Sequence, residues 1–394
     1  MNKKKYIRGF ILSLVLTFGI ISVFTLSTGI EENIEKLKSF IVYYAFLGIL
    51  MMIVKWIAET LILKVSLFDH KNKFGFFSLM RIVIIGNLFN YLTPFFTGGQ
   101  PVLVYYLSQK GIKPGETTAS IIYKSMIFQI VMTILGVVGF FYSYFNLNLK
   151  STMIILGGTL LNGFVIFLIL MFSLSKDKSV AVVRRFTFFL KKIKIVKKPE
   201  DKMEKILSNV ESFVKMFKTN SKKVPQFIMV ILLSTVQVMT YVFSIMFVLK
   251  GFDVGFSIDV FFKSLVLDIG AAIVPTPGTA GAAEGFYYII FAGTTDIFTI
   301  NTSVFIWRLV TYYFVIFIGI ILFMLRPKKA RDKWNRLLLF LVPRAGFEPA
   351  RAQLPIWPST IRVYQFHHLG KIYNRKLLYI RNFFLSIKYS CKFL

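Results

Sequence analysis

Long apolar runs, separated by short polar segments, make up most of the first 326 residues of the chain. Six of these runs reach the ~20 residues that an α-helix needs to cross the hydrocarbon core of a bilayer. Because lipid offers no hydrogen-bond partner to the backbone, spanning segments must be helices or closed barrels. The pattern therefore predicts an all-α polytopic membrane protein, with about six transmembrane helices at about 7–27, 40–62, 120–145, 152–174, 227–249 and 303–325.

Composition and charge support the same fold class. The chain has 394 residues, of which 56% are hydrophobic, and a formal net charge of +30. Such a charge is compatible with a nucleic-acid partner or with loops that face anionic lipid. The basic residues lie between the apolar runs, which favours the membrane and predicts no nucleic-acid partner.

The charge of each linker sets the expected orientation. Segment 1–8 carries four basic residues, segment 175–225 has fifteen Lys/Arg against five Asp/Glu, and segment 327–342 is again basic. Cytoplasmic loops of membrane proteins carry an excess of Lys and Arg, so we place these segments and both termini in the cytoplasm. Segments 28–39 and 250–302 are acidic and are expected outside. The protein is expected to reside in a bacterial-type plasma membrane.

Two further apolar stretches begin and end on the same side of the membrane in this orientation. Residues 63–119 start and finish inside, residues 250–302 start and finish outside, and their apolar runs are short or broken. We expect each to form a re-entrant helical hairpin. The two halves, about 7–145 and 152–326, then read as an inverted repeat, a design that places substrate sites between broken helices. The expected re-entrant turns contain Pro94, Gly98, Gly99, Pro275, Pro277, Gly278 and Gly281.

The remaining segments are polar. Loop 175–225 is expected to contact anionic inner-leaflet lipid, with a surface helix over 200–217; a solvated loop is the alternative. Segment 327–342 is a basic juxtamembrane stretch. Tail 343–394 is of doubtful origin, either disordered or a read-through artefact, because Gly346–Pro349 is what one frame of a tRNA gene would encode.

Ionisable side chains at membrane depth are the candidate functional residues. Glu284 follows a Pro/Gly break where a half-helix would begin, and Asp268 precedes the same break. Together they would suit a cationic group, with Arg308 or Lys124 neutralising Glu284 at rest. The alternative is that Glu284 only caps its own helix. At the other hairpin, Asn90 and Gln100 could bind a phosphate or hydroxyl, or satisfy the broken backbone.

Other charges at membrane depth have simpler interpretations. Lys55 and Glu59 are four residues apart and are expected to pair along one helix. Lys124 and Arg308 are expected near span ends, where their side chains can snorkel. No residue is assigned a catalytic role, and the single Cys391 and three histidines predict no metal site. We expect no cofactor.

Two stretches carry a resemblance to a known family. The segments "NLFNYLTPFFTGGQPVLVYYLSQKGIKPGETTASIIYK" and "VPTPGTAGAAEGFYYIIF" resemble the lysylphosphatidylglycerol synthase transmembrane (flippase-like) family, over about residues 5–326. Family members that also carry a cytosolic aminoacyltransferase domain move lysine from lysyl-tRNA to phosphatidylglycerol. The resemblance implies that the membrane region carries the lysyl-lipid to the outer leaflet, which repels cationic antimicrobial peptides.

The resemblance leaves three functional hypotheses. The first is a flippase for an aminoacylated or other phospholipid. The second is a phosphatidylglycerol lysyltransferase, as the family name says. Because the sequence shows no transferase domain, we expect no such activity from this chain alone. We expect a separate synthase protein as its partner. The third is a transporter of another lipid-linked solute, such as an isoprenoid-linked sugar.

Overall fold

The computed structural model describes residues 28–93, 96–173, 200–271, 273–274 and 276–325, together with positions 19, 22, 26 and 180. The described part is helical and contains no β-strand; Ala292 and Thr295 form an isolated bridge. Its helices are α2 (Ile30–Lys38), α3 (Val42–Ser66), η1 (Phe68–Lys73), α4 (Phe76–Tyr91), α5 (Gly99–Ser108), α6 (Pro114–Asn146), α7 (Leu149–Ser173), α9 (Glu200–Ser221), α10 (Val224–Lys250), α11 (Ile258–Ala271), α12 (Ala282–Phe291), α13 (Ile297–Arg308), η2 (Leu309–Tyr313) and α14 (Phe314–Met324).

Five helices of the described part are long and apolar enough to cross a membrane. They are α3, α6, α7, α10 and the continuous run of α13, η2 and α14. Each coincides with a span expected from the apolar runs, which confirms the all-α polytopic fold class. The expected first span at 7–27 lies outside the described residues, except for isolated positions, as do segments 327–342 and 343–394.

Local sequence signals explain where several spans begin. Pro114 lies in the first turn of α6, where its missing N–H is not needed, and Glu116 follows it there. The Asp296 side chain caps α13 by accepting the Thr299 N–H at 2.8 Å. Partial burial acts to raise the pKa of Asp296, but the hydrogen bonds from Thr299 and the nearby Lys36 outweigh it and lower the pKa below its ordinary value.

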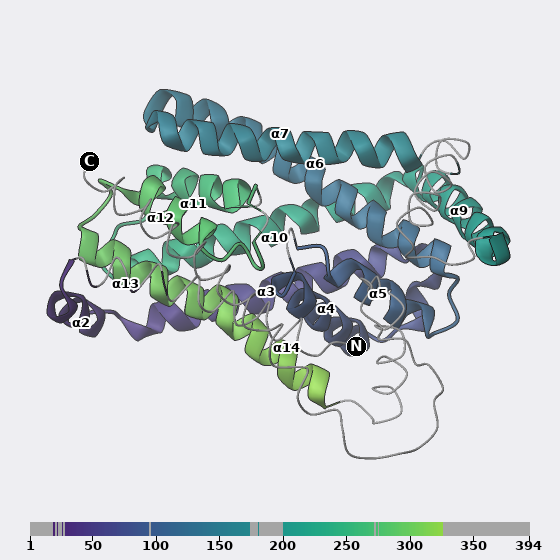
Figure 1. The fold of residues 1–394 in the computed structure, drawn as a ribbon, viewed down its shortest axis with the longest axis horizontal. Helices are drawn as coiled ribbons and strands as arrows, with labels where there is room; N and C mark the ends of the chain where they lie inside the picture. Colours follow the sequence, from purple (N-terminus) through teal and green to yellow (C-terminus); the bar gives the residue numbers. More distant parts are fainter. Residues whose placement is uncertain are drawn as a thin grey trace, which may run out of the picture. The chain divides into compact units, whose positions relative to one another are not determined.

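Helices α3 and α10 pack against each other in the middle of the described helices (Figure 1). Gly48 of α3 makes room for the Val310 side chain of η2, since a Cβ there would come within 3.0 Å of it. Helices α6 and α7 follow one another along one edge in Figure 1 and also contact each other. The contact between α3 and α10 joins a helix of the first half of the sequence to a helix of the second half.

The first short pair, α4 and α5, is broken at residues 92–98. The Asn90 side chain accepts the Gly99 N–H at 2.7 Å, and the Thr93 hydroxyl accepts the Gly98 N–H at 2.8 Å. A Cβ at Gly99 would approach the Gly86 carbonyl to 2.4 Å, so only glycine lets the two helices come this close. The conformation of the chain between α4 and α5 therefore depends on the Asn90 side-chain amide and on the glycines Gly98 and Gly99.

The second short pair, α11 and α12, is broken at residues 272–281. Gly278, Thr279 and Gly281 have φ values of 59°, 55° and 86°, a left-handed run that favours glycine. Pro277 lies in the same turn, whereas Pro94 and Pro275 lie outside the described residues. A Cβ at Gly278 would come within 3.0 Å of the Tyr91 carbonyl, so the turn of the second pair touches the end of α4.

The order of elements matches the expected repeat where it is described. The first half contains a long helix, the first short pair and a long helix; the second contains two long helices, the second short pair and a final long helix. The inverted orientation of the halves and the re-entrant course of the short pairs stay predictions.

The expected surface helix is confirmed as α9, which packs on α6 through Phe217 and places the Asn209 carbonyl against Gly115. Most of residues 174–199 lies outside the described part.

Helix α2 packs on α13 through its polar side and exposes its apolar side. The Asn301 side chain of α13 donates to Asn33 of α2 at 3.1 Å, and Asn33 is buried. Ile30, Ile34 and Leu37 share one face of α2 and are 50%, 48% and 37% exposed. In water this arrangement would expose apolar area without compensation, so we expect this face of α2 to lie in the membrane interface.

A pair of spin labels tests this expectation. With Cys391 replaced by serine, Ile34→Cys and Glu35→Cys place nitroxides on the apolar and the charged faces of α2. In lipid nanodiscs the label at position 34 should be more accessible to oxygen and less accessible to a water-soluble nickel complex than the label at position 35. Equal accessibilities at the two positions would show that α2 does not lie in the interface.

Candidate functional site

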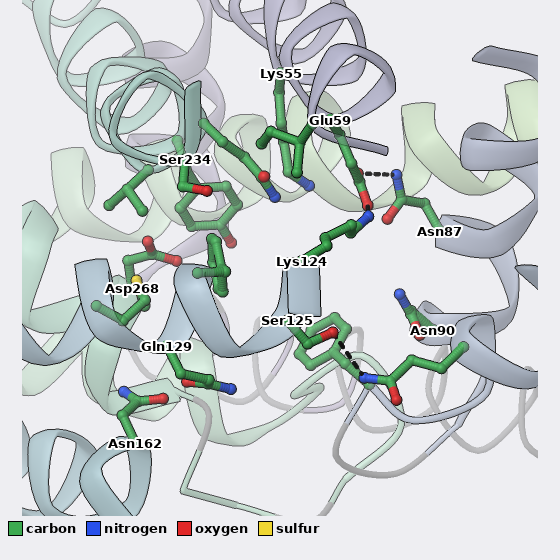
Figure 2. A pocket seen from close by; sticks show the side chains of 18 of the residues that line it. Lys55, Glu59, Asn87, Asn90, Lys124, Ser125, Gln129, Asn162, Ser234 and Asp268 are labelled. Carbon is green, nitrogen blue, oxygen red and sulfur yellow. Dashed lines mark hydrogen bonds and ion pairs between the residues drawn. The ribbon is translucent and has the colours of Figure 1, made fainter. Parts of the chain in front are cut away.

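A cavity of about 300 Å³ lies inside the helical unit. It is bordered by α3, α4, α5, α6, α7, α10 and α11, and by the turn that holds Thr279. Figure 2 shows its charged and amide-bearing side chains. Its polar lining consists of Lys55, Glu59, Asn87, Asn90, Tyr91, Gln100, Lys124, Ser125, Gln129, Asn162, Ser234, Gln237, Tyr241, Asp268 and Thr279.

One ion pair in the cavity wall is fully satisfied. The Glu59 carboxylate of α3 accepts the Lys124 ammonium of α6 at 2.7 Å and the Asn87 amide of α4 at 2.8 Å. Glu59 is 7% exposed and Lys124 is 9% exposed. Opposite charges at this depth need each other, because lone buried charges are costly. This trio ties together three helices of the first half.

Two further charges line the same cavity without such a partner. Within the described residues, neither Lys55 of α3 nor Asp268 of α11 forms an ion pair or a hydrogen bond, and the Lys55 ammonium lies 6.0 Å from the centroid of the Tyr91 ring. Both side chains are partly exposed to the cavity. A cation and an anion that make no direct bond, but attract each other electrostatically across it, therefore face a polar space inside an apolar bundle.

Neutral polar groups complete the lining. The Gln100 amide of α5 donates to the Ser125 hydroxyl at 3.5 Å, close to Asn90 in Figure 2. Gln129, Asn162 and Ser234 each have a buried polar atom with no hydrogen-bond partner among the described residues. The lining therefore offers both charged and uncharged hydrogen-bonding groups to a ligand.

Glu284 and Arg308 form a second buried pair behind this cavity. The Arg308 guanidinium approaches the two carboxylate oxygens of Glu284 at 2.8 Å and 2.9 Å, and the same carboxylate accepts the Gly281 N–H at 2.7 Å. Glu284 is 0% exposed and Arg308 is 1% exposed, and neither lines the cavity. Arg308 also donates to the Thr279 carbonyl at 3.3 Å. The Glu284 carboxylate therefore caps α12, and its ion pair with Arg308 links the turn before α12 to the last long helix.

Some of the residues that the sequence analysis singled out line the cavity, and others do not. Asp268, Asn90 and Gln100 come together at the cavity, and Glu284 with Arg308 does not. A substrate contact by Glu284 stays a prediction, while its geometry agrees with the capping alternative. Among the described residues, no group of three His, Cys, Asp or Glu gathers as a metal site would require.

Two expectations about charges were wrong. Glu59 does not pair with Lys55 one turn away, because Lys124 and Asn87 from other helices reach it instead. Arg308 and Lys124 do not snorkel to the surface: Arg308 lies inside the 28-residue helical run 297–324, and both side chains are buried. The sequence also missed Gln129, Asn162 and Ser234 of the cavity, although polar residues inside apolar runs were a signal that could have found them.

We predict that Glu284→Gln lowers the stability of the fold. The change leaves the buried Arg308 charge unpaired, at a cost of about 3–5 kcal/mol. Unfolding of the purified protein in detergent should shift accordingly, and Glu284→Gln combined with Arg308→Gln should lose less than the sum of the single changes.

Glu116→Gln is the matched control, because it breaks the partly exposed pair with His70. We expect a loss of about 0–1 kcal/mol from it. A Glu284→Gln protein as stable as the wild type, yet unable to bind or move its ligand, would instead support direct contact of Glu284 with the ligand.

Comparisons with known proteins agree with this architecture. The family model of the lysylphosphatidylglycerol synthase TM region matches residues 10–319. A UPF0104 membrane protein of Archaeoglobus fulgidus is 26% identical over 324 residues, which cover 79% of this chain and 94% of that protein. No solved structure matches the chain significantly. The family match covers both short helix pairs and all but the last residues of the described spans, so the chain belongs to the lysylphosphatidylglycerol synthase TM-region family and is a multi-pass membrane protein.

Proposed function

We propose that this protein moves a phospholipid between the two leaflets, with the headgroup passing through the cavity while the acyl chains stay in the bilayer. The observation that carries the proposal is a polar space of about 300 Å³, inside helices that are apolar enough to span, which a cation and an anion face without a directly bonded partner among the described residues. Charged groups at membrane depth are rare and mark substrate pathways. A headgroup needs such a polar environment, because its charges cannot cross the hydrocarbon unaided.

Lys55 is the residue that would hold the phosphate. Its ammonium faces the cavity and, within the described residues, has no carboxylate bonded to it, whereas the Lys124 ammonium is already occupied by Glu59. Asn90 and Gln100, which also line this space, would add amide hydrogen bonds. Charge-assisted hydrogen bonds are about twice as strong as neutral ones, so the phosphate would dominate binding.

Asp268 is the residue that would receive a positive part of the headgroup. An aminoacylated phospholipid, the cargo that the family name favours, carries both a phosphate and an ammonium, which matches the two unpaired charges. Glu284 would contribute indirectly, by holding the turn at Thr279, which lines the cavity. A separate synthase would supply the aminoacylated lipid, and its export would reduce binding of cationic antimicrobial peptides. The setting would be a bacterial-type plasma membrane with both termini in the cytoplasm.

The contact between the two chain breaks would act as the gate. The Gly278 turn lies against the end of α4 and against Tyr312 in the π-helical segment η2. Segments of π-helix are frequent at functional sites. A shift of η2 would move the turn and Arg308 together, because Arg308 bonds both Glu284 and the Thr279 carbonyl. Alternating access by rocking of one repeat against the other is typical of inverted-repeat transporters.

Reconstitution into liposomes tests this proposal. The protein should accelerate the transfer of fluorescent phospholipid, measured by dithionite quenching of the outer leaflet. Lys55→Gln should reduce the rate at least about tenfold for every phospholipid, because the loss of a charged hydrogen bond costs about 1.5–3 kcal/mol. Asp268→Asn should slow aminoacylated lipid selectively.

Lys110→Gln provides the control, since Lys110 is exposed and does not line the cavity. The measurement requires equal amounts of folded protein in each set of liposomes. Wild-type rates with Lys55→Gln would contradict the assignment of the phosphate to Lys55, and no acceleration by the wild type would contradict lipid transfer itself.

A further inference from the structure

The Asp268 carboxylate lies in an unfavourable place for a negative charge. It belongs to the last turn of α11, where backbone carbonyls lack partners within the helix and the helix dipole is negative. Its side chain lines the cavity, and no residue of the described part forms a hydrogen bond or an ion pair with it (Figure 2). A buried carboxylate needs a compensating charge, or else it takes up a proton and becomes neutral.

The compensating charge is the ammonium of Lys55 on α3. The two groups attract each other across the cavity, although no direct bond joins them. Glu59, one turn farther along α3, also attracts the Lys55 ammonium, but its carboxylate is already bonded to Lys124 and Asn87. Lys55 is therefore the charge on which an ionised Asp268 depends.

The other ionisable groups around Asp268 cannot replace Lys55. Helices α6, α7, α10 and α12 pack on α11, and α7 carries a single charged residue, Lys150, which is exposed in its first turn. The groups that face α11 or the cavity from the remaining elements are Lys124 and Tyr142 of α6, Tyr241 of α10, Glu284, Tyr287 and Tyr288 of α12, and Tyr91 of α4. Lys124 is bonded to Glu59 and Glu284 to Arg308, and tyrosines are neutral near neutral pH.

A phosphate bound to Lys55 removes this compensation. In the proposed function the positive charge of Lys55 is neutralised by the lipid phosphate and no longer balances Asp268. A headgroup that carries an ammonium supplies a new cation to the carboxylate. A purely anionic headgroup supplies none and leaves two anions in one space of about 300 Å³. Like charges that share a site favour a proton on one of them, and the carboxylate binds a proton more strongly than a phosphodiester does.

We propose that Asp268 is a proton-binding site and that an anionic lipid enters the cavity together with one proton. This inference rests on the proposed function, because it requires a phosphate on Lys55. The proton passes from a hydronium ion in the cavity to a carboxylate oxygen of Asp268, where an O–H bond forms, and it returns to water when the lipid leaves. Lipid and proton then move in the same direction, so a pH difference across the membrane drives an anionic lipid away from the acidic side.

Binding of two short-chain lipids in detergent tests this inference. Dioctanoyl phosphatidylmethanol carries a phosphodiester and no ammonium, whereas dioctanoyl phosphatidylethanolamine carries both. In weak buffer at about pH 8, a pH indicator should report uptake of up to about one proton for each phosphatidylmethanol bound to the wild type, and none for phosphatidylethanolamine. The affinity for phosphatidylmethanol should fall by up to about tenfold for each unit of rising pH, because the complex binds the additional proton.

Two asparagine variants on α11 locate the proton. Asp268→Asn imitates the neutral carboxyl, so it should bind phosphatidylmethanol without proton uptake and with an affinity that does not change with pH. Asp259→Asn is the matched control, because Asp259 pairs with Lys263 at 2.7 Å and lies outside the cavity. It should keep the proton uptake of the wild type. In liposomes, an acidic exterior should drive phosphatidylmethanol inward with the wild type and not with Asp268→Asn.

The outcomes separate this inference from the proposed function. Phosphatidylmethanol that binds to the wild type with a pH-independent affinity and without proton uptake would overturn the proton site and leave lipid transfer intact. Proton uptake that persists in Asp268→Asn would overturn the assignment to Asp268. The absence of any lipid binding or transfer would overturn the proposed function and this inference with it. If Asp268→Asn fails to fold, as judged by thermal unfolding, the comparison of the two lipids on the wild type still decides the question.

Discussion

The architecture depends on a single constraint, that a charge inside an apolar bundle must be paired or must face a polar space. Arg308 and Glu284 satisfy it by direct contact, and so do Lys124 and Glu59. Each pair joins segments that are distant in sequence: the first ties the turn before α12 to the last long helix, and the second ties α3 to α6. With these four charges neutralised, Lys55 and Asp268 are the charges that face the cavity and, among the described residues, have no bonded partner.

The same pairs connect the cavity to the chain breaks. Glu284 holds the turn that contains Thr279, and Thr279 lines the cavity. Asn90 caps the first break through Gly99 and also lines the cavity. Both breaks therefore combine two tasks: they satisfy backbone groups that lipid cannot, and they border the polar space. In our account, movement of the breaks changes the access of a headgroup to the cavity.

The sequence predicted the fold well because each span is a local property. Apolar runs of sufficient length and the Pro/Gly breaks are visible without knowledge of any contact, and the five expected spans among the described residues were found within six residues of their predicted bounds. Charge partners are not local. The pairing of Lys124 with Glu59 joins residues 65 apart, and spacing along one helix had favoured Lys55 instead. The neutral side chains of the cavity were missed for the same reason, since Asn162 becomes informative only when α7 is seen to pack against α6 and α11.

Photocrosslinking from the cavity tests the central claim, that a lipid headgroup enters this space, most directly. A photoreactive amino acid replaces Gln237, which lines the cavity, or Phe141, which is 57% exposed on the outer surface of α6. After illumination in membranes, mass spectrometry should find phospholipid joined through its headgroup at position 237 and through its acyl chain at position 141. Acyl-chain adducts at position 141 together with no phospholipid at position 237 would contradict the account.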